Sequence, residues 1–289
     1  MAFNGLAFVT SGFILQNESS TKWAYIKKYN IIGRMYLFDF NKNKAEVEQL
    51  EVIGSNGGFD VSRFLPHGIS GWQDAKTGKK TLFVVNHERL GVDCIEKFEF
   101  IPGKKQLKHV KRYRDDTMLL VNDVQVTGEN SFYFTNFGTG PSQRMMMVQI
   151  LGRTSWNTVV YFDGKTYRVV LDGMAMSNGL YMSNDGRQVY AVNSFPDNVV
   201  VDMKTGHLYV GSHPIQHILA NHINDPEIKT PSQVLKLDVK DGYIIRTREL
   251  LYDDGHVLSG SSTAVIYNNK LLVGSIIDKL IICDVNVPI

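Results

Sequence analysis

Short apolar runs that alternate with turns dominate the hydrophobic pattern of this chain. One unit recurs: a Gly- or Asn-bearing turn, a β-branched or aromatic run, and a small polar residue. It occupies residues 78–86, 128–136, 185–193, 205–212 and 268–275. Further strand-like runs lie at residues 35–40, 158–162 and 234–239, and residues 238–242 read as a hairpin turn. Runs of this kind bounded by turn residues are typical of strands, and only residues 213–221 show a helical pattern. The sequence therefore predicts an all-β chain.

The spacing of these runs favours a radial array of sheets, a β-propeller, formed as a single domain over residues 1–289. A four-stranded blade needs about 40 to 50 residues, yet the run centres Tyr190 and Tyr209 are only 19 residues apart. Either these two runs are neighbours in one blade, or the chain has lost a hairpin between Asn178 and Asp197. The periodicity leaves both interpretations open.

Charge and hydropathy exclude several classes of function. The 31 Lys and Arg residues nearly balance the 29 Asp and Glu residues and are scattered, which argues against nucleic-acid binding. The longest charge-free stretch, residues 1–17, is interrupted by polar residues and predicts neither a membrane helix nor a secretory signal. The tripeptide that begins at Asn17 is a glycosylation sequon, which fits an extracellular glycoprotein.

The cysteines give a narrower indication. Cys94 and Cys283 form no CxxC pair, which excludes zinc knuckles and redox dithiols. Whether the two pair with each other is left open by the sequence.

Three histidines lie near strand ends, where a propeller gathers functional side chains. They are His67, His87 and His213, while GxSxG, P-loop and HExxH motifs are absent from the sequence. A lone histidine is usually structural, but His67 and His87 each close an apolar run and could form a proton-transfer pair. His213 and His217 have the spacing of two ligands on one helix face, and we interpret this pair as structural.

Oxygen-bearing side chains follow three of the apolar runs. They come as Asn122 with Asp123, Asn178 before a glycine, and Asp197 with Asn198. Oxygen donors that converge on a tunnel suit calcium, which takes 6 to 8 oxygen ligands. Ordinary Asx turns are the alternative reading of the same residues.

Six segments, taken in order, resemble the paraoxonase family of serum paraoxonase/arylesterases and lactonases, and together they span almost the whole chain. They are FDVSRFLPHGIS (59–70), LFVVNH (82–87), VNDV (121–124), SNGLYMSNDGRQVY (177–190), PDNVVVD (196–202) with TGHLYVGSHP (205–214), and VLSGSSTAVIYNNKLLVGS (257–275). The resemblance implies a six-bladed β-propeller that holds two calcium ions in its central tunnel.

The resemblance also assigns roles to single residues. It implies that one group of four residues ligates the catalytic calcium: Asn122, Asn178, Asp197 and Asn198. Asp123 and the backbone carbonyl of Ile69 would serve the structural calcium. His67 and His87 match the family's histidine dyad, and His213 matches a pocket-edge motif.

The sequence departs from the family pattern in ways that bear on function. In the family an acidic pair, one carboxylate for each calcium, precedes the segment that resembles NGLAF (4–8); this pair and the half-cystine partner of Cys283 are not among the 289 residues, so two free thiols are expected. The family carries further strands between Tyr190 and Asp197, which implies one incomplete blade here. TNFG (135–138) stands where the family has TNDH.

The resemblance implies a calcium-dependent hydrolase of lactones and aryl esters, extending to organophosphate triesters, in which His67 and His87 activate water. Without the acidic pair, calcium should bind weakly and the chain should be nearly inactive. The alternative is a catalytically impaired relative that acts as a membrane-associated chaperone or binding module, and TNFG would suit it. Either reading implies an extracellular or membrane-associated protein, with small esters or a membrane or lipoprotein surface as partners.

Overall fold

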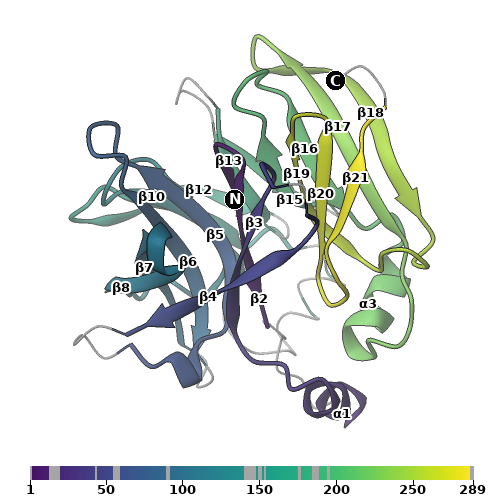
Figure 1. Cartoon of the computed structure of the whole chain (residues 1–289), viewed down its shortest axis with the longest axis horizontal. Helices are drawn as coiled ribbons and strands as arrows, with labels where there is room; N and C mark the ends of the chain where they lie inside the picture. Colours follow the sequence, from purple (N-terminus) through teal and green to yellow (C-terminus); the bar gives the residue numbers. More distant parts are fainter. Residues whose placement is uncertain are drawn as a thin grey trace. The chain divides into compact units, whose positions relative to one another are not determined.

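The computed structural model of the chain describes residues 2–12, 20–42, 44–54, 59–88, 92–139, 148, 152, 154–174, 177–183, 189–193 and 196–286. Strands make up most of it, as the hydrophobic pattern predicts (Figure 1). The first strands are β1 (Ala2–Phe3), β2 (Leu6–Ser11), β3 (Arg34–Asp39), β4 (Val47–Ile53), β5 (Pro66–Gln73), β6 (Lys80–Glu88), β7 (Val92–Ile101), β8 (Gln106–Tyr113), β9 (Leu120–Val126), β10 (Phe132–Gly138), β11 (Asn157–Phe162) and β12 (Tyr167–Met174). They are followed by β13 (Ser177–Met182), β14 (Val189–Asn193), β15 (Pro196–Val201), β16 (Leu208–Ser212), β17 (Ser232–Lys240), β18 (Tyr243–Asp253), β19 (Ser261–Tyr267), β20 (Lys270–Ser275) and β21 (Ile281–Asp284).

The strands pair with their chain neighbours into antiparallel sheets. Strands β1–β4 and β5–β8 each form such a series, and a parallel pairing of β4 with β8 joins the two into one eight-stranded sheet. Strands β9–β12 and β15–β18 form four-stranded sheets, and β19–β21 form a three-stranded one. This repetition of short antiparallel sheets is what the recurring turn-and-strand units predict.

The structure explains why the runs centred on Tyr190 and Tyr209 are only 19 residues apart. Tyr190 lies in β14, which pairs with β13, whereas Tyr209 lies in β16, between β15 and β17. The two runs therefore belong to different sheets, so the interpretation that made them neighbours in one blade is wrong. Among the described residues the β13–β14 sheet has two strands, which agrees with a hairpin lost from this part of the chain.

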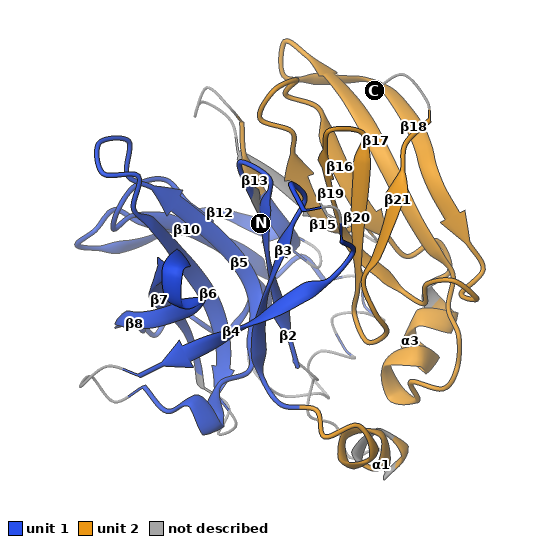
Figure 2. Cartoon of the chain, viewed as in Figure 1, with its two compact units in different colours: residues 1–14, 32–180 blue, residues 15–31, 181–289 orange. Residues whose placement is uncertain are grey.

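The chain divides into two compact units. Unit 1 comprises residues 1–14 and 32–180, and unit 2 comprises residues 15–31 and 181–289 (Figure 2). The candidate residues His67, Ile69, Asn122 and Asn178 fall in unit 1, together with His87 and Asp123. Asp197, Asn198 and His213 fall in unit 2.

Strand β6 shows how the sequence builds the core of unit 1. Its apolar run is continuous, so both faces of the strand must be covered. Leu82 and Val84 point to one face and join a buried cluster with Phe98 and Leu107. The alternate residues, Phe83 and Val85, point to the opposite face and join a second cluster, with Phe132, Phe134 and Val160.

Unit 2 repeats the same construction. On β16, Leu208 and Val210 enter one apolar cluster and Tyr209 enters another. The β17–β18 hairpin turns at Asp241 and Gly242, both with positive φ, and this confirms the predicted turn.

The observed helices agree only in part with those predicted from the hydrophobic pattern. Helix α3 (Gln216–Asn224) begins three residues later than the predicted helix, after Pro214. Helix α1 (Ser20–Lys28) was missed because it lacks a periodic apolar stripe. Its one sequence signal is the spacing of Tyr25 and Tyr29, four residues apart, whose rings contact each other at a tilted angle. Cys94 and Cys283 are both free thiols, as expected.

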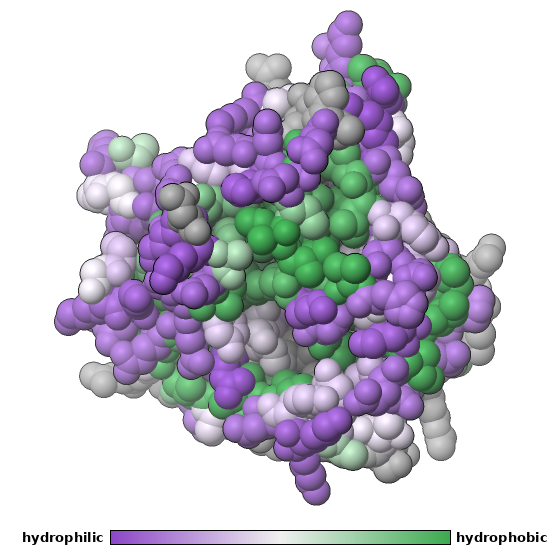
Figure 3. All heavy atoms as spheres, turned by 45° about the vertical axis from the view of Figure 1, so that its right-hand side comes forward, coloured by the Kyte–Doolittle hydropathy of each residue, from purple (hydrophilic) through white to green (hydrophobic). Residues whose placement is uncertain are grey.

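Some apolar side chains remain on the surface of the outer strands. Val169, Val170 and Leu171 of β12 are about half exposed, as are Ile244 and Ile245 of β18. On the face drawn in Figure 3, hydrophobic side chains gather in places among hydrophilic ones. None of the described helices has the length and apolar character needed to cross a membrane.

Candidate functional site

Two strands of unit 1 approach each other so closely that only glycine fits between them. Strand β5 crosses β9 at Gly68, where a Cβ would collide with the Asn122 carbonyl oxygen and lie 2.6 Å from the Asp123 Cα. Ser70, two residues along the same face, accepts a hydrogen bond from the Val126 N–H at 3.1 Å. The contact places His67 and Ile69, on either side of Gly68, beside the Asn122–Asp123 pair.

Replacing Gly68 by alanine should therefore disrupt the site. We expect the free energy of unfolding to fall by about 1 to 3 kcal/mol, because an added methyl group forces the backbone of β5 away from β9. The matched control is Gly103→Ala, where a Cβ meets nothing within 4 Å and the change should stay within about 0.5 kcal/mol. Urea unfolding measures both, and equal effects would contradict the close packing.

His67 and His87, predicted as a pair from the strand ends, do lie together. His67 Nδ1 is 3.1 Å from His87 Nε2, and both rings belong to unit 1. The chain before His67 is fixed at Leu65, whose N–H donates to Asn86 Oδ1 at 2.9 Å and whose carbonyl accepts from the His87 N–H at 3.1 Å. Burial, and then the charge of His87, lowers the pKa of His67 well below its ordinary value, so the ring is neutral near pH 7.

A third group, which the hydrophobic pattern does not mark, extends this pair. Asp93 Oδ1 lies 2.9 Å from His87 Nδ1, and Asp93 Oδ2 accepts a hydrogen bond from the Val121 N–H at 2.6 Å. The available signal was the β6–β7 hairpin, whose register sets His87 opposite Asp93. A carboxylate six residues after a strand-end histidine would have been found by pairing the two strands in antiparallel register.

The predicted oxygen donors of unit 1 also come together. Thr135 accepts a hydrogen bond from the Asp123 N–H at 3.1 Å and donates its own hydroxyl to the Asn178 carbonyl at 2.9 Å. The Asp123 carboxylate accepts hydrogen bonds from the N–H groups of Val124 and Leu180. Asp123 and Asn178 are thus held by one network centred on the fully buried Thr135, and Asn122 directly precedes Asp123 on β9.

Two oxygens of this group suit a cation. Asn122 Oδ1 and Asn178 Oδ1 are buried and have no hydrogen-bond partner among the described residues. A buried oxygen without a partner is costly, and side-chain amide oxygens are ligands that calcium accepts. The two amide oxygens are therefore donors of the kind that calcium binds.

Unit 2 carries the other predicted donors. Asp197 Oδ2 lies 3.3 Å from His213 Nε2, and Asp197 Oδ1 accepts from Asn198 Nδ2 at 3.2 Å. Asn198 Nδ2 also donates to the Ser262 carbonyl. His213 precedes α3 and His217 lies exposed on it, so the two histidines do not form a ligand pair on one helix face.

Two further features of the sequence are the TNFG segment and the glycosylation sequon. Thr135 to Gly138 lie on β10, where Phe137 is half-buried and Gly138 pairs with Leu120 of β9. The sequon at Asn17 lies outside the described residues.

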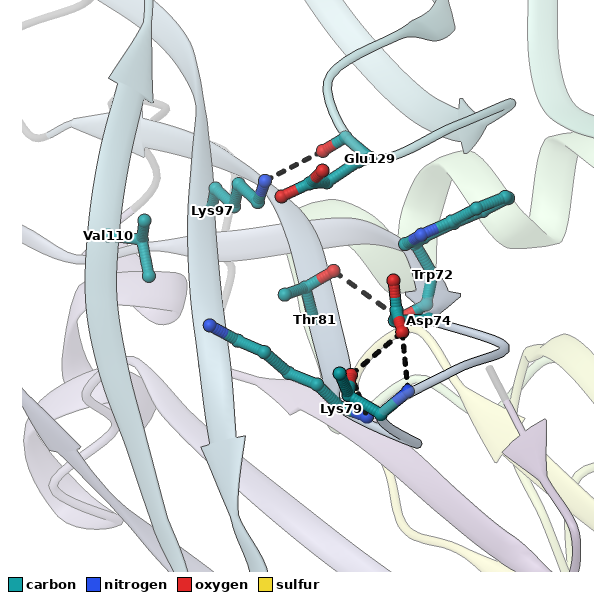
Figure 4. A pocket seen from close by; sticks show the side chains of 8 residues that line it. Trp72, Asp74, Lys79, Thr81, Lys97, Val110 and Glu129 are labelled. Carbon is teal, nitrogen blue, oxygen red and sulfur yellow. Dashed lines mark hydrogen bonds between the residues drawn. The ribbon is translucent and has the colours of Figure 1, made fainter.

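A separate hollow of about 270 Å³ lies elsewhere in unit 1 (Figure 4). Trp72, Lys79 and Glu129 are among the residues that line it. The Lys97 ammonium points to the Glu129 carbonyl oxygen at 2.7 Å and also donates to Asn130 Oδ1. The hollow contains none of the predicted site residues, and its most buried cation is already paired.

Comparison with known proteins places these residues in a family. The matching family model is described as Arylesterase and covers residues 3–196 and 188–285. The chain belongs to the arylesterase family. The two matched stretches overlap at residues 188–196, where the short step from Tyr190 to Tyr209 begins.

Several relatives of this arylesterase family member match along most of their length. The human protein named serum paraoxonase/arylesterase 1 is 31% identical over 309 residues, which covers 97% of this chain and 83% of the relative. Serum paraoxonase/arylesterase 2 of Gallus gallus and serum paraoxonase/lactonase 3 of Mus musculus are each 29% identical, with the same coverage.

Proposed function

We propose that this member of the arylesterase family is a calcium-dependent hydrolase of lactones and aryl esters. The observation that carries the proposal is that His67, which pairs with His87, directly precedes Gly68, the residue of β5 that packs against Asn122 and Asp123. A proton acceptor beside a group of hard oxygen donors is the arrangement that metal-assisted ester hydrolysis requires. The names of the relatives support the same class of substrate.

The proposed reaction assigns each group a task. Asn122 and Asn178 would hold the catalytic calcium, for which Asp197 and Asn198 stay predicted ligands from the resemblance. Asp123 and the Ile69 carbonyl would hold the structural calcium. Bound calcium would supply Lewis-acid polarisation of the ester carbonyl. His67 accepts a proton from a water molecule as the water oxygen bonds to the carbonyl carbon. The carbon–oxygen bond of the ester then breaks, and the departing oxygen takes up a proton, so a lactone yields a hydroxy acid.

The same chemistry extends to phosphotriesters, whose phosphoryl oxygen can occupy the place of the carbonyl. The wider predictions of the resemblance belong to this proposal as well: a six-bladed propeller whose short blade is β13–β14, and a glycosylated protein outside the cell that meets a membrane or lipoprotein surface. The word serum in the names of the relatives supports that location.

A matched pair of substrates tests the proposal. In calcium excess, the chain should hydrolyse a six-membered lactone and phenyl acetate slowly but with more than one turnover per molecule, and should leave the lactam of the same ring size intact. An ester oxygen leaves far more readily than an amide nitrogen, so the lactam reports non-specific hydrolysis. Lactone that binds without turnover would contradict the proposal and favour the non-catalytic relative.

A further inference from the structure

One carboxylate connects the histidine pair to the strand that carries Asn122 and Asp123. Asp93 is buried, with its side chain 6% exposed, and its two oxygens serve different partners. Oδ1 lies 2.9 Å from His87 Nδ1, and Oδ2 accepts the Val121 N–H of β9 at 2.6 Å. The contacts therefore run from His67 through His87 to Asp93 and on to β9.

We infer that Asp93 is a positioning residue that fixes the tautomers of both histidines and thereby makes His67 Nε2 the proton acceptor. The inference rests on the proposed function for its kinetic consequence only. The tautomers themselves follow from the hydrogen-bond geometry.

The direction of the hydrogen bonds follows from what each group can donate. A carboxylate accepts only, so His87 Nδ1 carries a hydrogen that faces Asp93. In the uncharged form of His87, Nε2 therefore has a lone pair, and the 3.1 Å contact requires the hydrogen of His67 to lie on its Nδ1. The lone pair of His67 is left on Nε2.

Asp93→Asn separates this role from simple packing. The amide has nearly the shape of the carboxylate, and its oxygen can still accept the Val121 N–H. Its NH₂ group would then face His87 Nδ1 and donate to it, which moves the hydrogen of His87 to Nε2. The N–H groups of His87 Nε2 and His67 Nδ1 would then face each other, and the hydrogen bond between the rings would be lost unless His67 also changes its tautomer.

Nuclear magnetic resonance of the full-length ¹⁵N-labelled chain reads the tautomers directly, with His87→Gln to assign the signals. We expect His87 to be protonated on Nδ1 in the wild type and on Nε2 in Asp93→Asn. The matched control is Asp163→Asn, because the partners of the Asp163 carboxylate among the described residues are Lys165 and Thr166, in a turn of the same unit. It should leave the His87 signals unchanged.

The kinetic arm uses lactone in calcium excess. Asp93→Asn should lower kcat about 10²-fold while KM stays within about threefold, because the general base loses its orientation and substrate contacts remain. In a His87→Gln background the same change should cost less than about threefold, since Asp93 acts through His87.

Each outcome bears on the inference. A wild-type His87 protonated on Nε2, or an Asp93→Asn chain with wild-type tautomers, would overturn it. So would a further loss of about 10²-fold in the His87→Gln background. If the tautomers move as expected but no variant or wild-type chain hydrolyses lactones, the positioning role stands and the proposed function fails.

Discussion

Replacing His67 by glutamine is expected to lower the rate of lactone hydrolysis by at least about 10²-fold, the lower range of general acid–base catalysis. Glutamine can still hydrogen-bond to His87 but cannot take a proton from water. His87→Gln should cost less, because His87 orients and assists His67 from 3.1 Å away.

Initial rates in calcium excess measure the effect, with His217→Gln as the matched control. His217 is exposed on α3 in unit 2 and has no role in the proposed reaction, so its loss controls for the removal of an imidazole. A His67→Gln chain with undiminished kcat, or an equal loss in the control, would remove His67 from the proposed reaction.

The second large effect concerns stability, and its sign depends on calcium. Asn122→Leu should raise the free energy of unfolding in calcium-free buffer by about 1 kcal/mol, because it removes a buried oxygen that lacks a partner. With an affinity of about 10⁻⁴ to 10⁻³ M, about 10 mM calcium would stabilise the wild type by roughly 1.4 to 2.7 kcal/mol. The variant should lose most of this gain.

Asn136→Leu is the matched control for this change. Asn136 is a buried asparagine of β10 whose amide accepts from the Leu119 N–H and donates to the Thr117 carbonyl and the Thr158 hydroxyl. Its replacement should lower the free energy of unfolding by at least about 2 kcal/mol and leave the calcium response in place. Urea unfolding with and without calcium measures both variants. An Asn122→Leu chain that is destabilised like the control, or that keeps the full calcium response, would contradict the assignment of Asn122.

Much of the fold is predictable because its strands are marked locally. The run LFVV of β6 is buried on both faces, and the turn at Asp241 and Gly242 fixes the β17–β18 register, so both follow from residues adjacent in sequence. The spacing alone could not show whether Tyr190 and Tyr209 belong to one sheet or to two. A strand belongs to the sheet of the strands it pairs with, and the spacing of apolar runs does not identify those partners.

The site was predictable only in part, for a related reason. His67 and His87 are recognisable because each follows an apolar run. Asp93 carries no signal of its own and matters through its register opposite His87 and its contact with Val121 of another sheet. Thr135, which joins Asp123 to Asn178, cannot be recognised from the sequence either, because its two partners lie 12 and 43 residues away along the chain.

The most direct test of the account is the rate of lactone hydrolysis by the full chain as a function of calcium concentration. We predict that turnover rises with calcium, saturates over the same range in which calcium stabilises the fold, and falls to background when a chelator is added. Lactone turnover that is the same with chelator as with calcium, or no turnover at any calcium concentration, would contradict it.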